Sequence, residues 1–154
     1  MILPRLGMYT AMAFAALLWT GCNDDDDAGC DPSLIEVRSL EQEYGCPDTP
    51  YGIALGIEND FIIISSQAEY EQWVTGTCNA VIDYDEFDLV IGSQQVTGTL
   101  TEIDYTYRQV CPTFRFELIV VIHTTASSST PTLTYHALVP KLGTNQAVDV
   151  VLEV

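Results

Sequence analysis

Residue types that carry most enzyme chemistry are scarce in this chain. Among its 154 residues only two histidines, His123 and His136, offer a base near neutral pH. Neither lies near a serine, cysteine or aspartate in the spacing of a known nucleophile elbow or catalytic triad. The chain also lacks Gly-x-Ser-x-Gly, His-Glu-x-x-His and glycine-rich phosphate-loop patterns. We therefore expect both histidines to lie on strand surfaces or edges, and we expect neither enzymatic activity nor a cofactor.

One acidic cluster lies inside the chain, at Asp83, Asp85, Glu86 and Asp88. Paired carboxylates can act as acid and base in hydrolysis, and several together can bind calcium. On an extended segment, however, Asp83 and Asp85 share one face while Glu86 and Asp88 share the other. We expect a solvated cluster at the entrance to a strand. Weak calcium binding and a carboxylate-dependent hydrolase are the alternatives.

Residues 1–21 predict a bacterial signal peptide. Arg5 supplies a positive charge, and the apolar run that follows is too short to span a bilayer. The next segment, Trp-Thr-Gly-Cys at residues 19–22, resembles a lipobox, in which the cysteine is acylated and becomes the mature N-terminus. We expect lipidation of Cys22, although Trp19 replaces the usual aliphatic residue. An ordinary cleaved signal is the alternative.

Residues 22–33 predict an acidic, flexible tether. Asp24, Asp25, Asp26 and Asp27 follow the candidate lipidation site almost directly. Like charges repel each other and keep such a segment extended. The run also resembles the export signal of some Gram-negative surface lipoproteins. The expected location is therefore the outer membrane with exposure at the cell surface, and its periplasmic face is the alternative.

The other four cysteines predict two disulfides. They are Cys30, Cys46, Cys78 and Cys111. Export places them in an oxidising compartment, where an even number of cysteines usually pairs. Three pairings are open, and we favour Cys30 with Cys46 and Cys78 with Cys111. Zinc is disfavoured because no two of these cysteines have the close spacing of a metal site.

The charge balance excludes several classes of partner. The chain has 5 Lys+Arg against 22 Asp+Glu, a formal net charge of -17. Nucleic-acid binding needs clustered basic residues, and anionic membrane surfaces repel an acidic protein. We therefore expect a protein partner, no nucleic acid, and membrane contact only through the lipid anchor. Hydrophobic residues make up 47% of the chain, enough to bury a core.

The elements that must position these residues are mostly strands. Ser66 and Glu69 form a capping-box pattern, followed by apolar residues at helical spacing, which predicts a helix over about 66–75. From residue 87 onward apolar residues alternate with polar ones, which predicts strands. A break in this alternation near Thr101 indicates a β-bulge.

These elements predict one strand-rich domain over residues 34–154. Short polar turns between the later strands favour antiparallel hairpins. The expected class is α+β and mostly antiparallel β, with a β-sandwich-like sheet domain and one short helix.

Residues 61–154 also show a recognisable order of features. An apolar strand at residues 61–64 precedes the predicted helix, and residues 82–90 pass from acidic and aromatic residues into an apolar strand. A Val-Pro step at residues 139–140 lies near the end. This order resembles the PrcB-like domain, named for a bacterial lipoprotein that stabilises a surface protease complex. The resemblance implies a non-enzymatic accessory role and transfers no catalytic residues.

The sequence thus favours a lipid-anchored envelope or cell-surface protein that stabilises or docks to another protein, such as a secreted protease complex. A protease-inhibitor-like domain is the first alternative. A carboxylate-dependent hydrolase and a calcium-stabilised adhesive domain are the others, because a fold alone does not determine function.

Overall fold

Strands dominate the computed structural model, which describes residues 34–111 and 113–154. The predicted signal peptide, the acidic tether, Cys22 and Cys30 lie outside the described residues. In chain order the elements are β1 (Leu34–Ile35), α1 (Leu40–Tyr44), α2 (Thr49–Gly52), β2 (Ile53–Leu55), β3 (Asp60–Ile64), α3 (Gln67–Trp73), β4 (Val74–Gly76), β5 (Phe87–Gln95), β6 (Thr99–Val110), β7 (Arg115–Thr125), β8 (Thr132–Pro140) and β9 (Ala147–Glu153).

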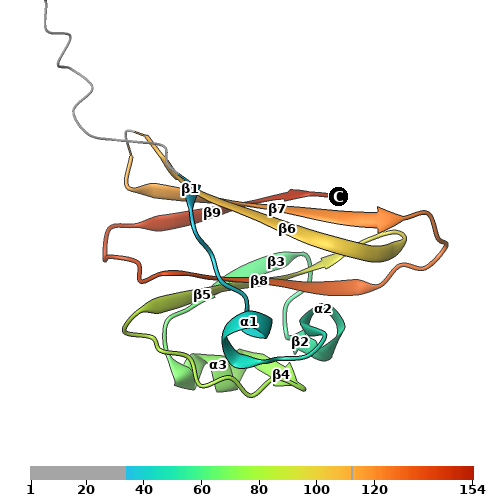
Figure 1. Ribbon diagram of the computed structural model, residues 1–154, viewed down its shortest axis with the longest axis horizontal. Coiled ribbons are helices and arrows are strands. Elements are labelled where there is room, and N and C mark those ends of the chain that lie inside the picture. Colours follow the sequence, from blue (N-terminus) through green and yellow to red (C-terminus); the bar gives the residue numbers. More distant parts are fainter. Residues whose placement is uncertain (1–33, 112) are drawn as a thin grey trace, which may run out of the picture.

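These elements form three layers (Figure 1). One outer layer is a four-stranded sheet with the order β1-β6-β7-β9, and the middle layer is a three-stranded sheet with the order β3-β5-β8. The other outer layer holds the three helices and the small β2-β4 sheet. The predicted class, a mostly antiparallel β-rich domain with sandwich-like sheets, is confirmed.

Two hydrophobic cores lie on opposite faces of the middle sheet. Val90, Tyr135 and Ala137 pack into the core shared with the four-stranded sheet. Leu89 and Leu138 pack into the core shared with the helical layer. The middle strands are therefore covered on both faces, and their long apolar runs follow from that double burial.

The predicted helix is confirmed as α3. The Ser66 hydroxyl accepts a hydrogen bond from the Glu69 amide, and the Glu69 carboxylate accepts one from the amide of Ser65. The first contact satisfies an amide that the first helical turn leaves without a partner, and the second binds the residue before the N-cap to the helix. The helix ends at Trp73, because the chain becomes extended at Val74 and enters β4.

The later strands form as predicted, but most consecutive ones do not pair with each other. The pairing of β6 with β7 shifts register between Leu100 and Glu102, which confirms the bulge. The expectation of antiparallel hairpins is confirmed only for β6 with β7 and is wrong for the other consecutive strands from β5 onward; β9 pairs with β7 in parallel. The reason is that the connections after β5, β7 and β8 cross between the middle sheet and the four-stranded sheet instead of reversing within one sheet.

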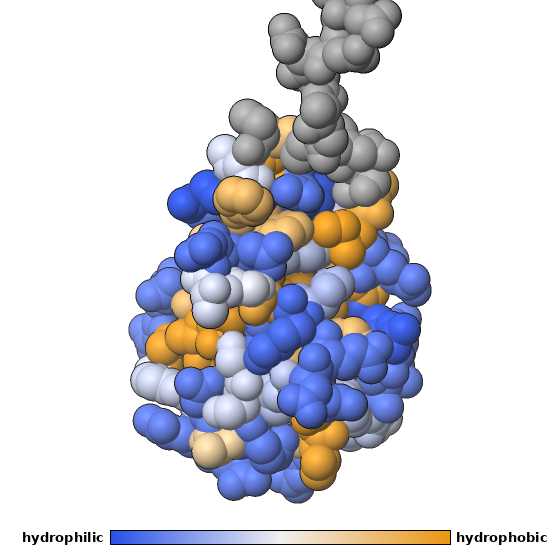
Figure 2. Space-filling view, turned by 90° about the vertical axis from the view of Figure 1, so that its left-hand side faces the viewer, coloured by the Kyte–Doolittle hydropathy of each residue, from blue (hydrophilic) through white to orange (hydrophobic). Residues whose placement is uncertain are grey.

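Hydrophilic residues cover most of one side of the domain, with smaller apolar patches between them (Figure 2). Within the described ranges, no helix has both the length and the apolar character that crossing a membrane requires.

Candidate functional site

His136 lies in the interior of the domain, with only 3% of its side chain exposed. The expected strand-surface or edge position is therefore wrong for this histidine. It occupies the polar phase of β8, but the helical layer covers that face of the middle sheet. His123 is exposed on β7 as expected, and its Nε2 lies 2.9 Å from Asp104 Oδ2. The two histidines are not part of one site.

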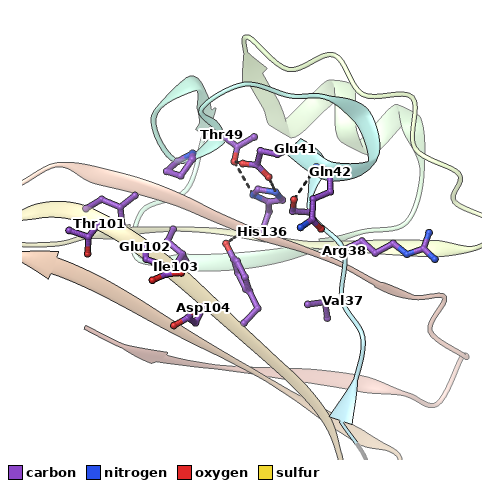
Figure 3. Close-up of a pocket in the computed structure, with 14 residues that line it drawn as sticks. Val37, Arg38, Glu41, Gln42, Thr49, Thr101, Glu102, Ile103, Asp104 and His136 are labelled. Atoms are coloured by element: carbon purple, nitrogen blue, oxygen red, sulfur yellow. Dashed lines mark hydrogen bonds and ion pairs between the residues drawn. The ribbon is translucent and has the colours of Figure 1, made fainter.

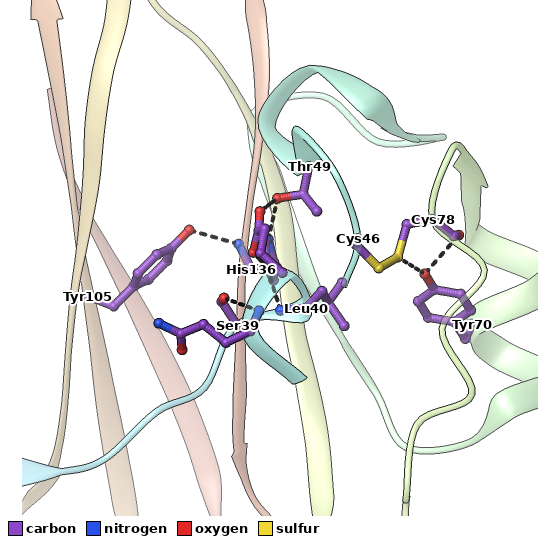
Figure 4. A network of polar contacts seen from close by, with 10 residues as sticks. Ser39, Leu40, Cys46, Thr49, Tyr70, Cys78, Tyr105 and His136 are labelled. Carbon is purple, nitrogen blue, oxygen red and sulfur yellow. Dashed lines mark hydrogen bonds and ion pairs between the residues drawn. A yellow bond between two sulfur atoms is a disulfide. The ribbon is translucent and has the colours of Figure 1, made fainter. Parts of the chain in front are cut away.

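The His136 ring links β8 to both short helices of the helical layer (Figure 4). Its Nε2 lies 3.0 Å from the Leu40 amide nitrogen and 3.0 Å from Glu41 Oε2. Its Nδ1 lies 3.4 Å from Thr49 Oγ1. The backbone N–H of His136 donates to the Tyr105 hydroxyl at 3.2 Å, so the network also reaches β6.

The protonation of His136 decides which Nε2 contact is a hydrogen bond. With Nε2 unprotonated, the ring accepts from the Leu40 amide; with Nε2 protonated, it donates to Glu41. Burial opposes the charge on Glu41. Hydrogen bonds from His136 and Thr49 and the electrostatic attraction of His136 outweigh burial and lower the Glu41 pKa to about 2.

Hydroxyl, imidazole and carboxylate are the groups of a nucleophilic triad, but here they are not connected in the order of a triad. The Thr49 hydroxyl donates to Glu41, and the side chain of Thr49 is fully buried. A nucleophile must reach its substrate and pass its proton to the base. We infer that the network of Glu41, Thr49 and His136 holds α1 and α2 against β8.

A cavity of about 490 Å³ opens beside this network (Figure 3). Residues 100–105 of β6 line one part of it, and Glu41 and Thr49 of the two short helices line another. His136 and Val37 contribute to the same lining. Cavities of this size bind small molecules or short chain segments, so this groove is the candidate functional site.

The groove is acidic. Glu41, Glu102 and Asp104 all contribute to its lining. Arg38 also lines it, but its side chain extends away from β6 (Figure 3), lies over the Phe87 ring at 5.3 Å and contacts Glu43. The groove therefore carries more negative than positive charge at its opening.

The predicted acidic cluster is divided by the structure. Asp88 is 1% exposed, which contradicts a solvated position, and it accepts hydrogen bonds from Lys141 Nζ and the Leu142 amide, both at 2.8 Å. Asp83, Asp85 and Glu86 stay exposed in the turn before β5. In the part of the chain that the structure describes, no three His, Cys, Asp or Glu side chains are grouped so that they could hold a metal ion.

The favoured disulfide pairing is wrong, because Cys46 is bonded to Cys78. Cys46 directly follows the left-handed Gly45 that ends α1, and Cys78 follows β4. Both sulfurs are buried in the same core, where the Tyr70 hydroxyl contacts Cys78 (Figure 4). The bond therefore fastens parts of the helical layer to each other. Cys111 is not free either, and Cys30 lies outside the described residues.

Sequence reasoning missed α1 and α2, and with them Glu41 and Thr49. One signal for α1 was present: Ser39 and Gln42 have the spacing of a capping box, and Gly45 can end a helix. In the structure the Ser39 hydroxyl accepts from the Gln42 amide, and Gly45 has φ 66°.

Comparison with known proteins finds no matching family model, no matching curated protein and no matching solved structure. The resemblance to the PrcB-like domain and the lipoprotein features of the N-terminus therefore remain predictions from the sequence.

Proposed function

We propose that this protein is a lipid-anchored accessory protein of the bacterial envelope, which docks to another protein and has no catalytic activity of its own. The observation that supports this proposal most directly is that buried side chains capable of acid–base chemistry bind other parts of the fold. His136 and Asp88 are buried in contacts that join elements of the fold, while the surface groove remains open.

The lipid anchor and the location come from the sequence. Cys22 in its lipobox-like context and the acidic run after it favour an outer-membrane lipoprotein exposed at the cell surface. The resemblance of residues 61–154 to the PrcB-like domain favours a secreted protease complex as the partner. An inhibitor-like domain would instead block a protease at stoichiometric amounts.

The anchor is tested with the protein purified from native membranes and a Cys22→Ser variant. Intact-mass analysis should show acylation of the wild-type N-terminal cysteine, and Cys22→Ser should leave the membrane fraction. An unmodified Cys22 in the membrane-purified protein would contradict the anchor.

The docking role is tested by cross-linking in intact cells, with both forms carrying a tag after the exposed Val154. The expected result is one defined partner that is recovered with the anchored protein and purifies with it in stoichiometric amounts. Turnover of an ester or glycan substrate by the purified protein, lost in Asp85→Asn, would overturn the non-enzymatic role.

A further inference from the structure

Strand β6 has an open edge along the groove. On one side it pairs with β7 over nearly its whole length, but on the other only Tyr107 and Arg108 pair, with β1. After β1 the chain moves away from β6, and Arg38 forms an isolated bridge with Leu138 of β8 in the middle sheet. Among the described residues, no strand therefore covers this edge over residues 99–106. The unpaired N–H and C=O groups of such an edge can pair with an added strand.

The side chains along this edge define what an added strand would meet. Ile103 and Tyr105 are partly buried against the core between the sheets. Glu102 and Asp104 are exposed, the latter with 57% of its side chain accessible. Successive residues of a strand point to opposite faces, and directly opposed side chains interact. One set of the added side chains would therefore lie beside Glu102 and Asp104, and the other set would lie beside Ile103 and Tyr105.

His123 already contacts Asp104 at 2.9 Å, and the described residues hold no free Lys or Arg side chain to neutralise Glu102. The described residues contain four Lys and Arg side chains, each already in an ion pair with a carboxylate. They are Arg38, Arg108, Arg115 and Lys141. A second copy of the chain carries the same net charge of -17, and the predicted tether carries four consecutive aspartates. Both occupants are repelled by an acidic edge.

We propose that a cationic, extended segment of a partner protein adds a strand to the open edge of β6. Its Lys or Arg residues lie beside Glu102 and Asp104, and its alternate small apolar residues lie beside Ile103 and Tyr105. This inference rests on the proposed docking function and names the surface and the chemistry of the partner.

The probe is an eight-residue peptide of alternating lysine and valine, acetylated and amidated, titrated into the full-length protein. The matched control is a peptide with the same composition in which four lysines precede four valines. Two further peptides carry N-methyl groups on the lysines only or on the valines only. Since alternate N–H groups of a strand point to the same side, only one of these two should lose binding.

The expected result is that the alternating peptide binds at least tenfold more tightly than the block peptide and shifts the amide signals of residues 99–106. The double variant Glu102→Lys with Asp104→Lys should weaken binding at least tenfold. The matched variant Asp85→Lys with Glu86→Lys makes the same charge change in the exposed turn outside the groove and should change binding less than twofold.

Equal binding of the alternating and block peptides, or equal loss in both double variants, would overturn the proposal in favour of unspecific charge attraction. No binding by the alternating peptide would also overturn it. The exposed carboxylates would then serve to prevent strand addition at the β6 edge. The docking function is tested separately: if the Glu102→Lys and Asp104→Lys protein still recovers the native partner, the edge is wrong and the docking role stands.

Discussion

At the scale of single residues, Glu41 makes the stability of the domain depend on pH. Its pKa lies at about 2 in the folded chain against an ordinary value of 4.5. A carboxyl group whose pKa is lower in the folded state stabilises that state above the ordinary pKa, and the stabilisation is lost as the pH falls toward the lowered value. The free energy of unfolding should therefore decrease between pH 5 and pH 2.

The variant Glu41→Gln isolates this contribution. It should be less stable than the wild type at pH 6, and the difference should shrink as the pH approaches 2, because the wild-type carboxyl group then becomes neutral as well. Urea unfolding at several pH values measures both effects. A Glu86→Gln variant changes an exposed carboxylate outside the network and serves as the control. A difference that stays constant from pH 6 to pH 2 would contradict the assignment.

Asp88 illustrates the second residue-scale effect, since its position in the cluster suggested calcium while its contacts are internal. Asp88→Ala removes the acceptor of both the Lys141 side chain and the Leu142 amide. Losing such contacts costs about 1 to 3 kcal/mol. Glu86→Ala, two residues away and exposed, should stay within about 0.5 kcal/mol of the wild type. Equal destabilisation by the two variants, measured by urea unfolding, would show that Asp88 has no special role.

At the scale of elements, Gly76 is the last residue of β4 and pairs with Ile53 of β2. Its φ is +124°, and a Cβ at this position would collide with the backbone carbonyl of Gly52. Gly76→Ala should therefore lower the melting temperature clearly, because both the backbone conformation and the close approach favour glycine. Gly56→Ala is the control, since nothing lies within 4 Å of the added atom and its φ is not positive. A melting temperature unchanged in Gly76→Ala would contradict this placement of β4.

The disulfide of the helical layer offers a second test of these elements. Digestion without reduction should yield a peptide pair joined through Cys46 and Cys78. In the chain-entropy description, closing a loop with a sequence separation of 32 stabilises by about 3 to 4 kcal/mol. Replacing both cysteines with serine should therefore lower the unfolding free energy by a similar amount. Recovery of Cys46 linked to Cys30 would restore the pairing favoured from the sequence.

Elements with local signals were predictable, and elements without them were not. The Ser66 cap and the bulge near Thr101 are encoded within a few residues, so the sequence alone indicated both. Helix α2 consists of four residues and begins from a left-handed Asp48 that makes no side-chain cap. A segment of that length has little helical preference of its own, because nucleation is unfavourable. Tertiary packing against β8 has to define it.

At the scale of the whole molecule, the candidate site depends on contacts that no local pattern reveals. Glu41 and Thr49 meet His136 across sequence separations of 95 and 87 residues. The interior position of His136 follows from the three-layer arrangement, in which a middle strand is covered on both faces. Alternation of apolar and polar residues predicted a strand at β8, but it could not reveal that helices cover the face on which His136 lies.

The net charge of the whole chain leads to the last prediction, which concerns salt. Exposed ion pairs such as Arg108 with Glu117 and Arg115 with Asp149 weaken when salt is added. Each contributes little to stability, because solvent screens exposed charges and ordering two long side chains costs entropy. Repulsion among the carboxylates destabilises the fold, and added salt weakens this repulsion. The chain has 22 Asp and Glu against 5 Lys and Arg, and each Lys and Arg of the described residues is already in an ion pair.

Repulsion should therefore outweigh the ion pairs, and moderate salt should stabilise the fold by screening it. The unfolding free energy measured with urea should rise between low and physiological concentrations of sodium chloride at pH 7. Sucrose of equal osmolality controls for solvent effects other than screening. The double variant Asp85→Lys with Glu86→Lys should show a smaller rise, because the altered chain repels itself less. A fall in stability with salt would mean that the few ion pairs dominate the charge balance of the folded chain.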